Sequence, residues 1–128
     1  MKLLLDTHIL LWVVAESRRI SAEGRELLGD PGHELLFSVV SIWEVAIKTS
    51  RGRDDFAVDA SRLLRRLLDN GYAELAVTGA HAAAVAGLPS IHRDPFDRML
   101  VAQATVERLT LVTADPVVAT YPCLVRRV

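Results

Sequence analysis

The chain has 128 residues, of which 51% are hydrophobic and 24% are charged, and its formal net charge is −1. This composition excludes an intrinsically disordered chain, and the length predicts a single domain over residues 1–128 with a core of its own. The near-neutral charge argues against a protein that holds nucleic acid by bulk positive charge, although a nuclease remains possible if an acidic metal site offsets basic residues elsewhere.

The first predicted unit is a buried strand followed by a helix. Leu3–Leu5 is an unbroken apolar run, which is typical of a strand covered on both faces in a parallel sheet. Asp6 follows it and places a carboxylate at the carboxyl end of that strand, the edge at which ligands bind in open α/β sheets. The segment 7–14 is apolar almost all round and predicts a buried helix capped by Asp6 or Thr7.

The next units repeat this alternation. Ser21 begins a predicted helix that the turn residues 29–32 end, and residues 34–39 predict a second strand. Ser41 and Glu44 have the spacing of a capping box, so we expect a helix from Ser41 onward that Gly52 ends. Residues 56–68 are amphipathic, with leucines on one face and arginines on the other, and predict another helix.

The last third of the chain also alternates between strands and helices. The predicted elements are a weakly marked strand at 74–77, an alanine-rich helix at 79–86, a helix from Asp94-Pro95 to about Arg108, a strand at 109–113, a helical turn from Asp115-Pro116 and a strand at 124–128. The whole pattern predicts an α/β fold with three layers, α/β/α, around a central and mostly parallel sheet.

Four acidic residues stand near the predicted starts of helices: Asp6, Glu44, Asp97 and Asp115. Each has an ordinary explanation, because carboxylates are favoured at helix N-termini by the macrodipole and by unpaired N–H groups. Asp6 and Asp115 follow strands directly, whereas Glu44 and Asp97 fall in the predicted first turns of helices.

Taken together, these four positions predict more than capping. In a parallel α/β sheet, every strand end that leads into a helix lies at one edge, so the four carboxylates would converge there. Anions gathered in this way repel one another unless a cation lies between them. Oxygen ligands without cysteine or a suitably spaced histidine favour Mg²⁺ or Mn²⁺ over Zn²⁺.

Four segments carry a resemblance to a known family: LLLDTH at 3–8, SVVSIWEVAIK at 38–48, HRDPFDRMLVAQA at 92–104 and LVTAD at 111–115. In this order they resemble a PIN domain, and more narrowly the VapC-type toxins of bacterial toxin–antitoxin pairs. The resemblance implies the α/β/α fold, a Mg²⁺- or Mn²⁺-dependent endoribonuclease, an antitoxin partner that blocks it, and a homodimer.

The resemblance also implies roles for the acidic residues. Asp6, Glu44, Asp97 and Asp115 match the catalytic positions, with Asp6, Asp97 and Asp115 as the metal ligands. Asp94 competes for the third position, but its place before Pro95 indicates a cap, and the spacing from Asp97 to Ala104 fits the family pattern. The expected reaction is in-line hydrolysis of an RNA phosphodiester by a metal-activated water, without a covalent intermediate.

Other residues are expected to support this site or to bind RNA. Thr7, Ser41 and Thr113 resemble the hydroxyl residues that hold the carboxylates in place. Arg98 and Arg93 flank the third motif and could contact phosphate, since a guanidinium offers two parallel donors.

The aromatic and imidazole side chains are expected to have structural roles. Trp12 and Trp43 lie on otherwise apolar helices, which favours packing in the core or an interface over base stacking. The four histidines have no spacing that marks an acid–base pair, so we expect packing or surface positions.

Cysteine content and hydropathy indicate the compartment. The single cysteine, Cys123, cannot form an internal disulfide, which fits a reducing cytoplasm. No leader and no apolar run of membrane-spanning length is present in the sequence, so we expect a cytoplasmic protein without a membrane partner.

Two alternative functions remain open at this point. Another Mg²⁺-dependent phosphoryl-transfer hydrolase, such as a haloacid-dehalogenase-type phosphatase, would carry a second aspartate two residues after the first, where this chain has His8. A non-catalytic partner-binding module with a PIN-like fold would not require the complete set of four carboxylates.

Overall fold

A five-stranded parallel sheet with the strand order β3-β2-β1-β4-β5 forms the centre of the computed structural model, which describes residues 1–52 and 58–128. The strands are β1 (Lys2–Leu5), β2 (Glu34–Ser38), β3 (Ala73–Leu75), β4 (Thr110–Thr113) and β5 (Val125–Arg127). The predicted α/β class is confirmed, and every strand pair in the sheet is parallel.

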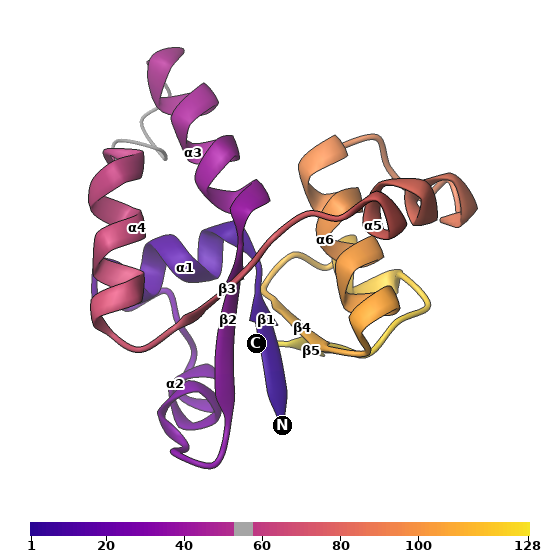
Figure 1. The fold of residues 1–128 in the computed structure, drawn as a ribbon. Helices are drawn as coiled ribbons and strands as arrows, with labels where there is room; N and C mark the ends of the chain where they lie inside the picture. The colour runs from indigo at the N-terminus through magenta and orange to yellow at the C-terminus, as the bar shows by residue number, and fades with distance from the viewer. Residues whose placement is uncertain (53–57) are drawn as a thin grey trace.

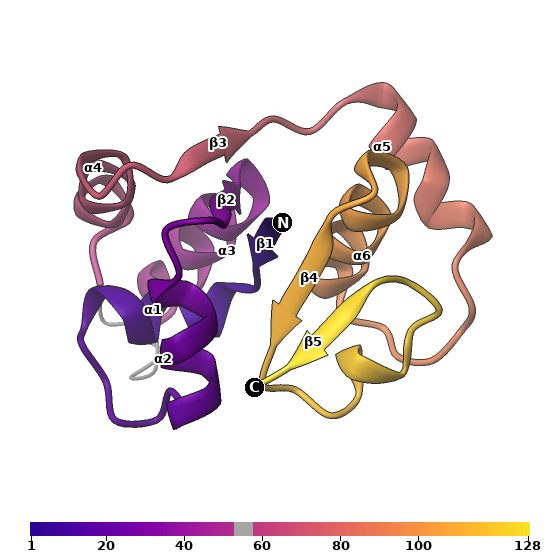
Figure 2. The same ribbon diagram turned by 90° about the horizontal axis from the view of Figure 1, so that it is seen from below.

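Helices cover both faces of this sheet. They are α1 (Thr7–Val14), α2 (Ala22–Gly29), α3 (Val39–Ser50), α4 (Ala60–Asp69), α5 (Gly79–Ala84) and α6 (Pro95–Glu107), with short 3-10 helices at Val85–Gly87 and Val118–Thr120. In both Figure 1 and Figure 2, α1, α2 and α4 lie on one side of the sheet, and α5 and α6 lie on the other. The structure therefore has the predicted three layers.

The central strand β1 contributes to both cores. Leu3 and Leu5 pack with α1 and α4 on one face, while Leu4 packs with α6 on the other. All three leucines are fully buried, and each such side chain stabilises the fold by roughly 1.5–3 kcal/mol. This two-sided burial fixes the end of β1, and therefore the position of Asp6.

Helix α3 begins earlier than the sequence pattern predicted. The Ser38 hydroxyl accepts a hydrogen bond from the Val40 N–H at 3.0 Å and caps the helix, which starts at Val39 directly after β2. The predicted capping box at Ser41 is therefore wrong, and Glu44 lies in the second turn instead of the first. Ser38 is as good a cap as Ser41, and the short connection after β2 favours it.

The other element boundaries differ from the predictions by a few residues. The alanine-rich helix stops at Ala84 and continues as a 3-10 turn, and the helical turn after Asp115 is a 3-10 helix at Val118–Thr120. The described part of the amphipathic helix begins at Ala60, and residues 56–57 of its predicted range lie outside the described residues.

Within the described ranges, none of the helices combines the length and the apolar character needed to cross a lipid bilayer.

Candidate active site

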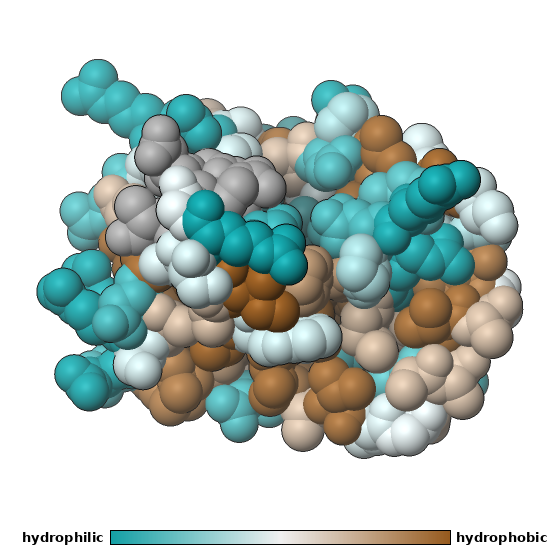
Figure 3. Space-filling view, turned by 90° about the horizontal axis from the view of Figure 1, so that it is seen from above, coloured by the Kyte–Doolittle hydropathy of each residue, from teal (hydrophilic) through white to brown (hydrophobic). Residues whose placement is uncertain are grey.

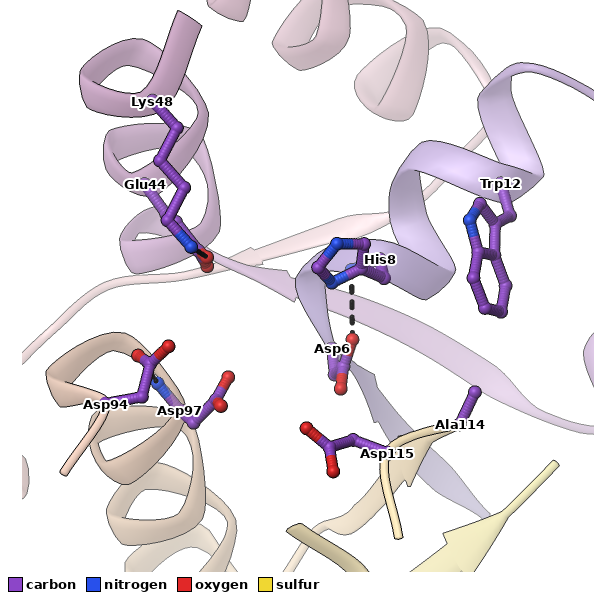
Figure 4. A pocket seen from close by; sticks show the side chains of 9 residues that line it. All are labelled: Asp6, His8, Trp12, Glu44, Lys48, Asp94, Asp97, Ala114 and Asp115. Atoms are coloured by element: carbon purple, nitrogen blue, oxygen red, sulfur yellow. Dashed lines mark hydrogen bonds and ion pairs between the residues drawn. The ribbon is translucent and has the colours of Figure 1, made fainter. Parts of the chain in front are cut away.

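The four acidic residues singled out in the sequence line one pocket of about 430 Å³ at the carboxyl edge of the sheet. They reach it from different elements: Asp6 follows β1, Glu44 lies on α3, Asp97 on α6, and Asp115 follows β4. Figure 4 shows their side chains around a common space, together with the other lining residues, which are His8, Trp12, Lys48, Asp94 and Ala114. The molecular face above this edge carries both hydrophilic and hydrophobic side chains (Figure 3).

Asp6 is the most central of these carboxylates. Only 6% of the residue is exposed, and it caps α1 by accepting from the His8 N–H at 2.9 Å. The Thr113 hydroxyl donates to its other oxygen at 2.5 Å. Burial raises the pKa of Asp6 above its ordinary value, and the Thr113 and His8 contacts partly oppose this rise. The expected support of Asp6 by Thr113 thus corresponds to a direct contact.

Glu44 is held by hydroxyls and by a cation. It is 2% exposed, and the Thr7 hydroxyl donates to its Oε1 at 2.7 Å. The Ser41 hydroxyl lies 2.9 Å from that of Thr7, so it contacts Glu44 only through Thr7. Lys48, one turn further along α3, donates to Oε2 of Glu44 at 2.5 Å. The cation compensates a carboxylate charge that would otherwise be buried at a large energetic cost.

Asp97 and Asp94 lie together at the start of α6. Asp94 caps the helix, because its Oδ1 accepts from the N–H groups of Phe96 and Asp97 at 2.9 and 3.1 Å. Asp97 lies in the first turn, as predicted, and its Oδ2 contacts Nε2 of His92 at 3.0 Å. The pKa of Asp97 is raised to about 6, chiefly by burial; the neighbouring charges of Asp94, Asp6 and Glu44 add to this rise, and the His92 contact partly opposes it.

Asp115 lies on the turn after β4, across the pocket from Asp97 (Figure 4). Its backbone N–H donates to the Thr113 hydroxyl at 3.0 Å, and its Oδ1 accepts from the Val117 N–H at 2.8 Å. The Thr113 hydroxyl therefore contacts both Asp6 and the backbone of Asp115. A single threonine at the end of β4 thus links the carboxylate of Asp6 to the backbone of Asp115.

The two arginines predicted to contact RNA lie beside the pocket and do not line it. Arg98 and Arg93 border a separate hollow of about 610 Å³ with Ser90, Ile91 and His92. One guanidinium nitrogen of Arg98 donates to the Pro89 carbonyl at 2.8 Å and to the Tyr121 hydroxyl at 3.0 Å. The RNA contact of these arginines stays a prediction.

Several residues of the site did not emerge from the sequence as functional. Lys48 is four residues after Glu44, a spacing that predicts an ion pair on a helix and could have revealed it. His8 and Trp12 line the pocket, and His92 contacts Asp97, so these histidines have more specific surroundings than general packing. Trp43 was expected to pack in the core or in an interface, and the core position is wrong: the residue is 59% exposed and packs edge-on against Phe96. The interface stays a prediction.

The donor set of the pocket fits a hard divalent cation. Its acidic members offer carboxylate oxygens, and their neighbouring charges add to the effect of burial in raising the pKa of Asp97. As the side chains of residues 1–52 and 58–128 are placed, no three acidic, histidine or cysteine residues form a ready coordination group. The carboxylates line a common space, and their side chains would have to move closer together to coordinate an ion.

Comparison with known families supports a relationship over most of the chain. The family model described as the PIN domain matches residues 3–122. Ribonuclease VapC22 of Mycobacterium tuberculosis is 30% identical over 113 residues, which cover 88% of this chain and 85% of that protein. The five acidic residues that line the pocket all lie within the span of the family model.

Solved structures show the same fold. The structure of VapBC2 from Rickettsia felis bound to a DNA fragment from its promoter matches with a TM-score of 0.73 at 16% identity, and the match covers 99% of this chain and 98% of that one. VapBC-5 of Mycobacterium tuberculosis, from the VapBC family of toxin–antitoxin systems, matches with a TM-score of 0.64 at 22% identity over 99% and 98% of the two chains.

Proposed function

Because the chain belongs to the PIN-domain family and resembles a VapC ribonuclease over most of its length, we propose that it is a Mg²⁺- or Mn²⁺-dependent endoribonuclease. In this proposal it acts as the toxin of a toxin–antitoxin pair. The observation that carries the proposal is the gathering of Asp6, Glu44, Asp97 and Asp115 around one pocket at the carboxyl edge of the sheet. Neither capping nor packing requires this convergence.

In the proposed site, Asp6, Asp97 and Asp115 hold the ion. When bound, a divalent ion supplies an acidified water and positive charge beside the scissile phosphate. Glu44, held by Thr7 and Lys48, orients the attacking water through its carboxylate. The reaction is hydrolysis at phosphorus, so water adds to the phosphate and the 3′-oxygen of the preceding nucleotide leaves with a proton.

The chain's own cation and aromatic groups support RNA binding at the same pocket. Lys48 lines the otherwise acidic pocket and offers positive charge to a phosphate. Trp12 and His8 line its opposite side and offer ring surfaces to a base. Arg93 and Arg98 border the adjacent hollow and are proposed as weaker contacts to the RNA backbone.

The proposed partners follow from family membership. We expect a cognate antitoxin that blocks the site and a homodimeric state, and we expect the pair to act in the cytoplasm. Co-expression with the gene that neighbours this one tests the antitoxin, because its product should relieve growth inhibition and copurify with the chain. Size-exclusion chromatography with light scattering tests the homodimer.

The central test is cleavage of RNA by the purified chain and by Asp6→Asn. We expect loss of about 10³-fold or more in rate, because several kcal/mol of metal-dependent stabilisation disappear with the ligand. The variant should fold and have a higher Tm, because burial raises the pKa of Asp6 and so disfavours its ionised form in the folded state. EDTA should stop the parent enzyme, and added Mn²⁺ should restore it.

Asp30→Asn is the matched control, because Asp30 is an exposed aspartate that caps a turn far from the pocket. It should cleave RNA like the parent. Sequencing of RNA ends after induced expression would identify the cut sites and the product termini. Cleavage by Asp6→Asn at the parental rate in Mg²⁺ would overturn the assignment of the site, and a parent protein that is harmless when expressed and has no antitoxin neighbour would favour a non-catalytic binding module.

A further inference from the structure

A chain of polar side chains leads from Arg98 to the pocket carboxylate Asp97. A guanidinium nitrogen of Arg98 lies 3.0 Å from the Tyr121 hydroxyl, which lies 2.7 Å from Nδ1 of His92. Nε2 of His92 lies 3.0 Å from Oδ2 of Asp97. We infer that these contacts form a one-way hydrogen-bond relay, from Arg98 through Tyr121 and His92 to Asp97, that positions Asp97 for the divalent ion. The inference rests on the proposed function.

The direction of the relay follows from its two ends, because the guanidinium of Arg98 can only donate and the ionised carboxylate of Asp97 can only accept from Nε2 of His92. A guanidinium can only donate, so the oxygen of Tyr121 accepts from Arg98. The hydroxyl proton of Tyr121 is then available for Nδ1 of His92. A neutral imidazole that accepts at Nδ1 carries its proton on Nε2, and this proton points to Asp97. This tautomer, assigned from the network, gives every donor in the relay an acceptor.

The relay is rigid at its origin. Arg98 also donates to the Pro89 carbonyl at 2.8 Å, which ties its guanidinium to the loop before α6. Tyr121 is 3% exposed, and the ring of His92 packs edge-on against its ring with 5.4 Å between centroids. Neither ring can rotate freely, so the Nε2–H of His92 has a fixed direction.

The topology of the relay gives it a positioning role. Arg98 and Asp97 are neighbours at the start of α6, while His92 and Tyr121 come from the loop before α6 and the segment after the 3-10 helix Val118–Thr120. The relay therefore leaves α6 and returns to it one residue away. It holds Oδ2 of Asp97 and directs the carboxylate toward the pocket, where Figure 4 shows it facing the space shared with Asp6.

Groups that orient a metal ligand commonly change metal affinity or activity by about 10–100-fold when removed. The Tyr121→Phe variant removes the hydroxyl and keeps the ring against His92. We expect Mn²⁺ binding, measured by isothermal titration calorimetry in the absence of RNA, to weaken by about 10-fold. The Mn²⁺ concentration for half-maximal cleavage should rise by the same factor, while KM for RNA at saturating Mn²⁺ stays at the parental value.

Tyr72→Phe is the matched control, because Tyr72 is the other tyrosine, is also buried, and lines a different pocket. It should bind Mn²⁺ like the parent. A second pair of variants acts on the imidazole: His92→Gln keeps an N–H donor near Oδ2 of Asp97, whereas His92→Ala does not. We therefore expect His92→Gln to bind Mn²⁺ more tightly than His92→Ala, with both folds verified by circular dichroism.

Parental Mn²⁺ affinity in folded Tyr121→Phe and His92→Ala would overturn the relay. Parental Mn²⁺ affinity in Asp97→Asn would overturn it too, because Asp97 would then not be a ligand. These outcomes differ from failure of the proposed function, which is read from RNA cleavage by Asp6→Asn. If Asp6→Asn is inactive while Tyr121→Phe binds Mn²⁺ like the parent, the proposed ribonuclease function stands and only the relay is refuted.

Discussion

Four of the five pocket carboxylates, all except Asp94, form an inner and an outer pair that the fold holds in different ways. The inner pair, Asp6 and Glu44, is almost fully buried, and each member receives a hydrogen bond from a threonine hydroxyl. The outer pair, Asp97 and Asp115, is half-buried and lies on a helix start and on a turn. Side-chain donors therefore hold the buried inner pair, whereas the outer pair lies at more accessible positions.

This difference indicates how the site combines precision with access. A buried carboxylate without donors destabilises a fold by several kcal/mol, so the inner charges depend on Thr113, Thr7 and Lys48. The outer carboxylates retain contact with solvent, so an ion or a phosphate can reach them. We expect substitutions at the inner supports to lower both stability and catalysis, and substitutions of the outer carboxylates to lower catalysis without a loss of stability.

The largest effect expected in this comparison is that of Thr113→Val. The variant keeps the side-chain shape but removes the hydroxyl that contacts both Asp6 and the backbone of Asp115. We expect cleavage at saturating RNA to fall by up to about 100-fold. The free energy of unfolding should fall by about 1–3 kcal/mol at neutral pH, because the buried charge of Asp6 loses its donor. Steady-state kinetics and urea denaturation measure the two effects.

Thr113→Ser is the control, because it keeps the hydroxyl and should retain most of the activity. Thr7→Val provides the equivalent change at Glu44, whose other oxygen still has Lys48, so its effect should be smaller. Full activity in Thr113→Val would contradict the dependence of the inner pair on its hydroxyls.

The next effect concerns the outer pair and pH. The pKa of Asp97 is about 6 in the folded protein against an ordinary value of 3.8. The folded state therefore binds more protons than the unfolded state between these values, so the free energy of unfolding falls as pH rises through this window. At 1.36 kcal/mol per pKa unit, Asp97 should lower stability by about 2 kcal/mol between pH 4 and pH 7 in EDTA.

Asp97→Asn isolates this contribution, because the other groups with raised pKa values, including Asp6, remain in both proteins. The difference in unfolding free energy between variant and parent, measured by urea denaturation at each pH, should grow in favour of the variant from pH 4 to pH 7. Parallel curves for the two proteins would show that Asp97 ionises in the folded state as it does in the unfolded chain.

The sequence predicts the local elements and the convergence of the carboxylates better than it predicts the contacts that support them. The buried run Leu3–Leu5 and the caps Asp6 and Asp94 are local patterns, and the structure has them where the pattern places them. The convergence of the four carboxylates follows from topology, since a parallel sheet brings these strand ends to one edge. Local pattern and topology together were sufficient for the fold and for the acidic set.

Contacts between distant segments are beyond such patterns. Two serines near the start of α3 are equivalent cap candidates in sequence, and only the end of β2 selects Ser38. The relay from Arg98 to Asp97 passes through Tyr121, which is 23 residues from Arg98 in the chain, so no local spacing indicates it. Trp43 is exposed although its helix is apolar, because tertiary packing decides which face of α3 is covered.

The smallest effect distinguishes Asp94 from Asp97, the two aspartates at the start of α6. Asp94 also lines the pocket, and its charge raises the pKa of Asp97. Asp94→Asn removes the charge and keeps an equally good cap, so the free energy of unfolding should change by only a few tenths of a kcal/mol. Because partly exposed charge pairs contribute about 0.2–1 kcal/mol, we expect cleavage to change by less than about fivefold.

Asp97→Asn should lose far more activity, and Asp94→Ala should lose about 1 kcal/mol of stability with the cap. If Asp94→Asn lost as much cleavage activity as Asp97→Asn, Asp94 would be a metal ligand too. The start of α6 would then hold the ion through both of its aspartates.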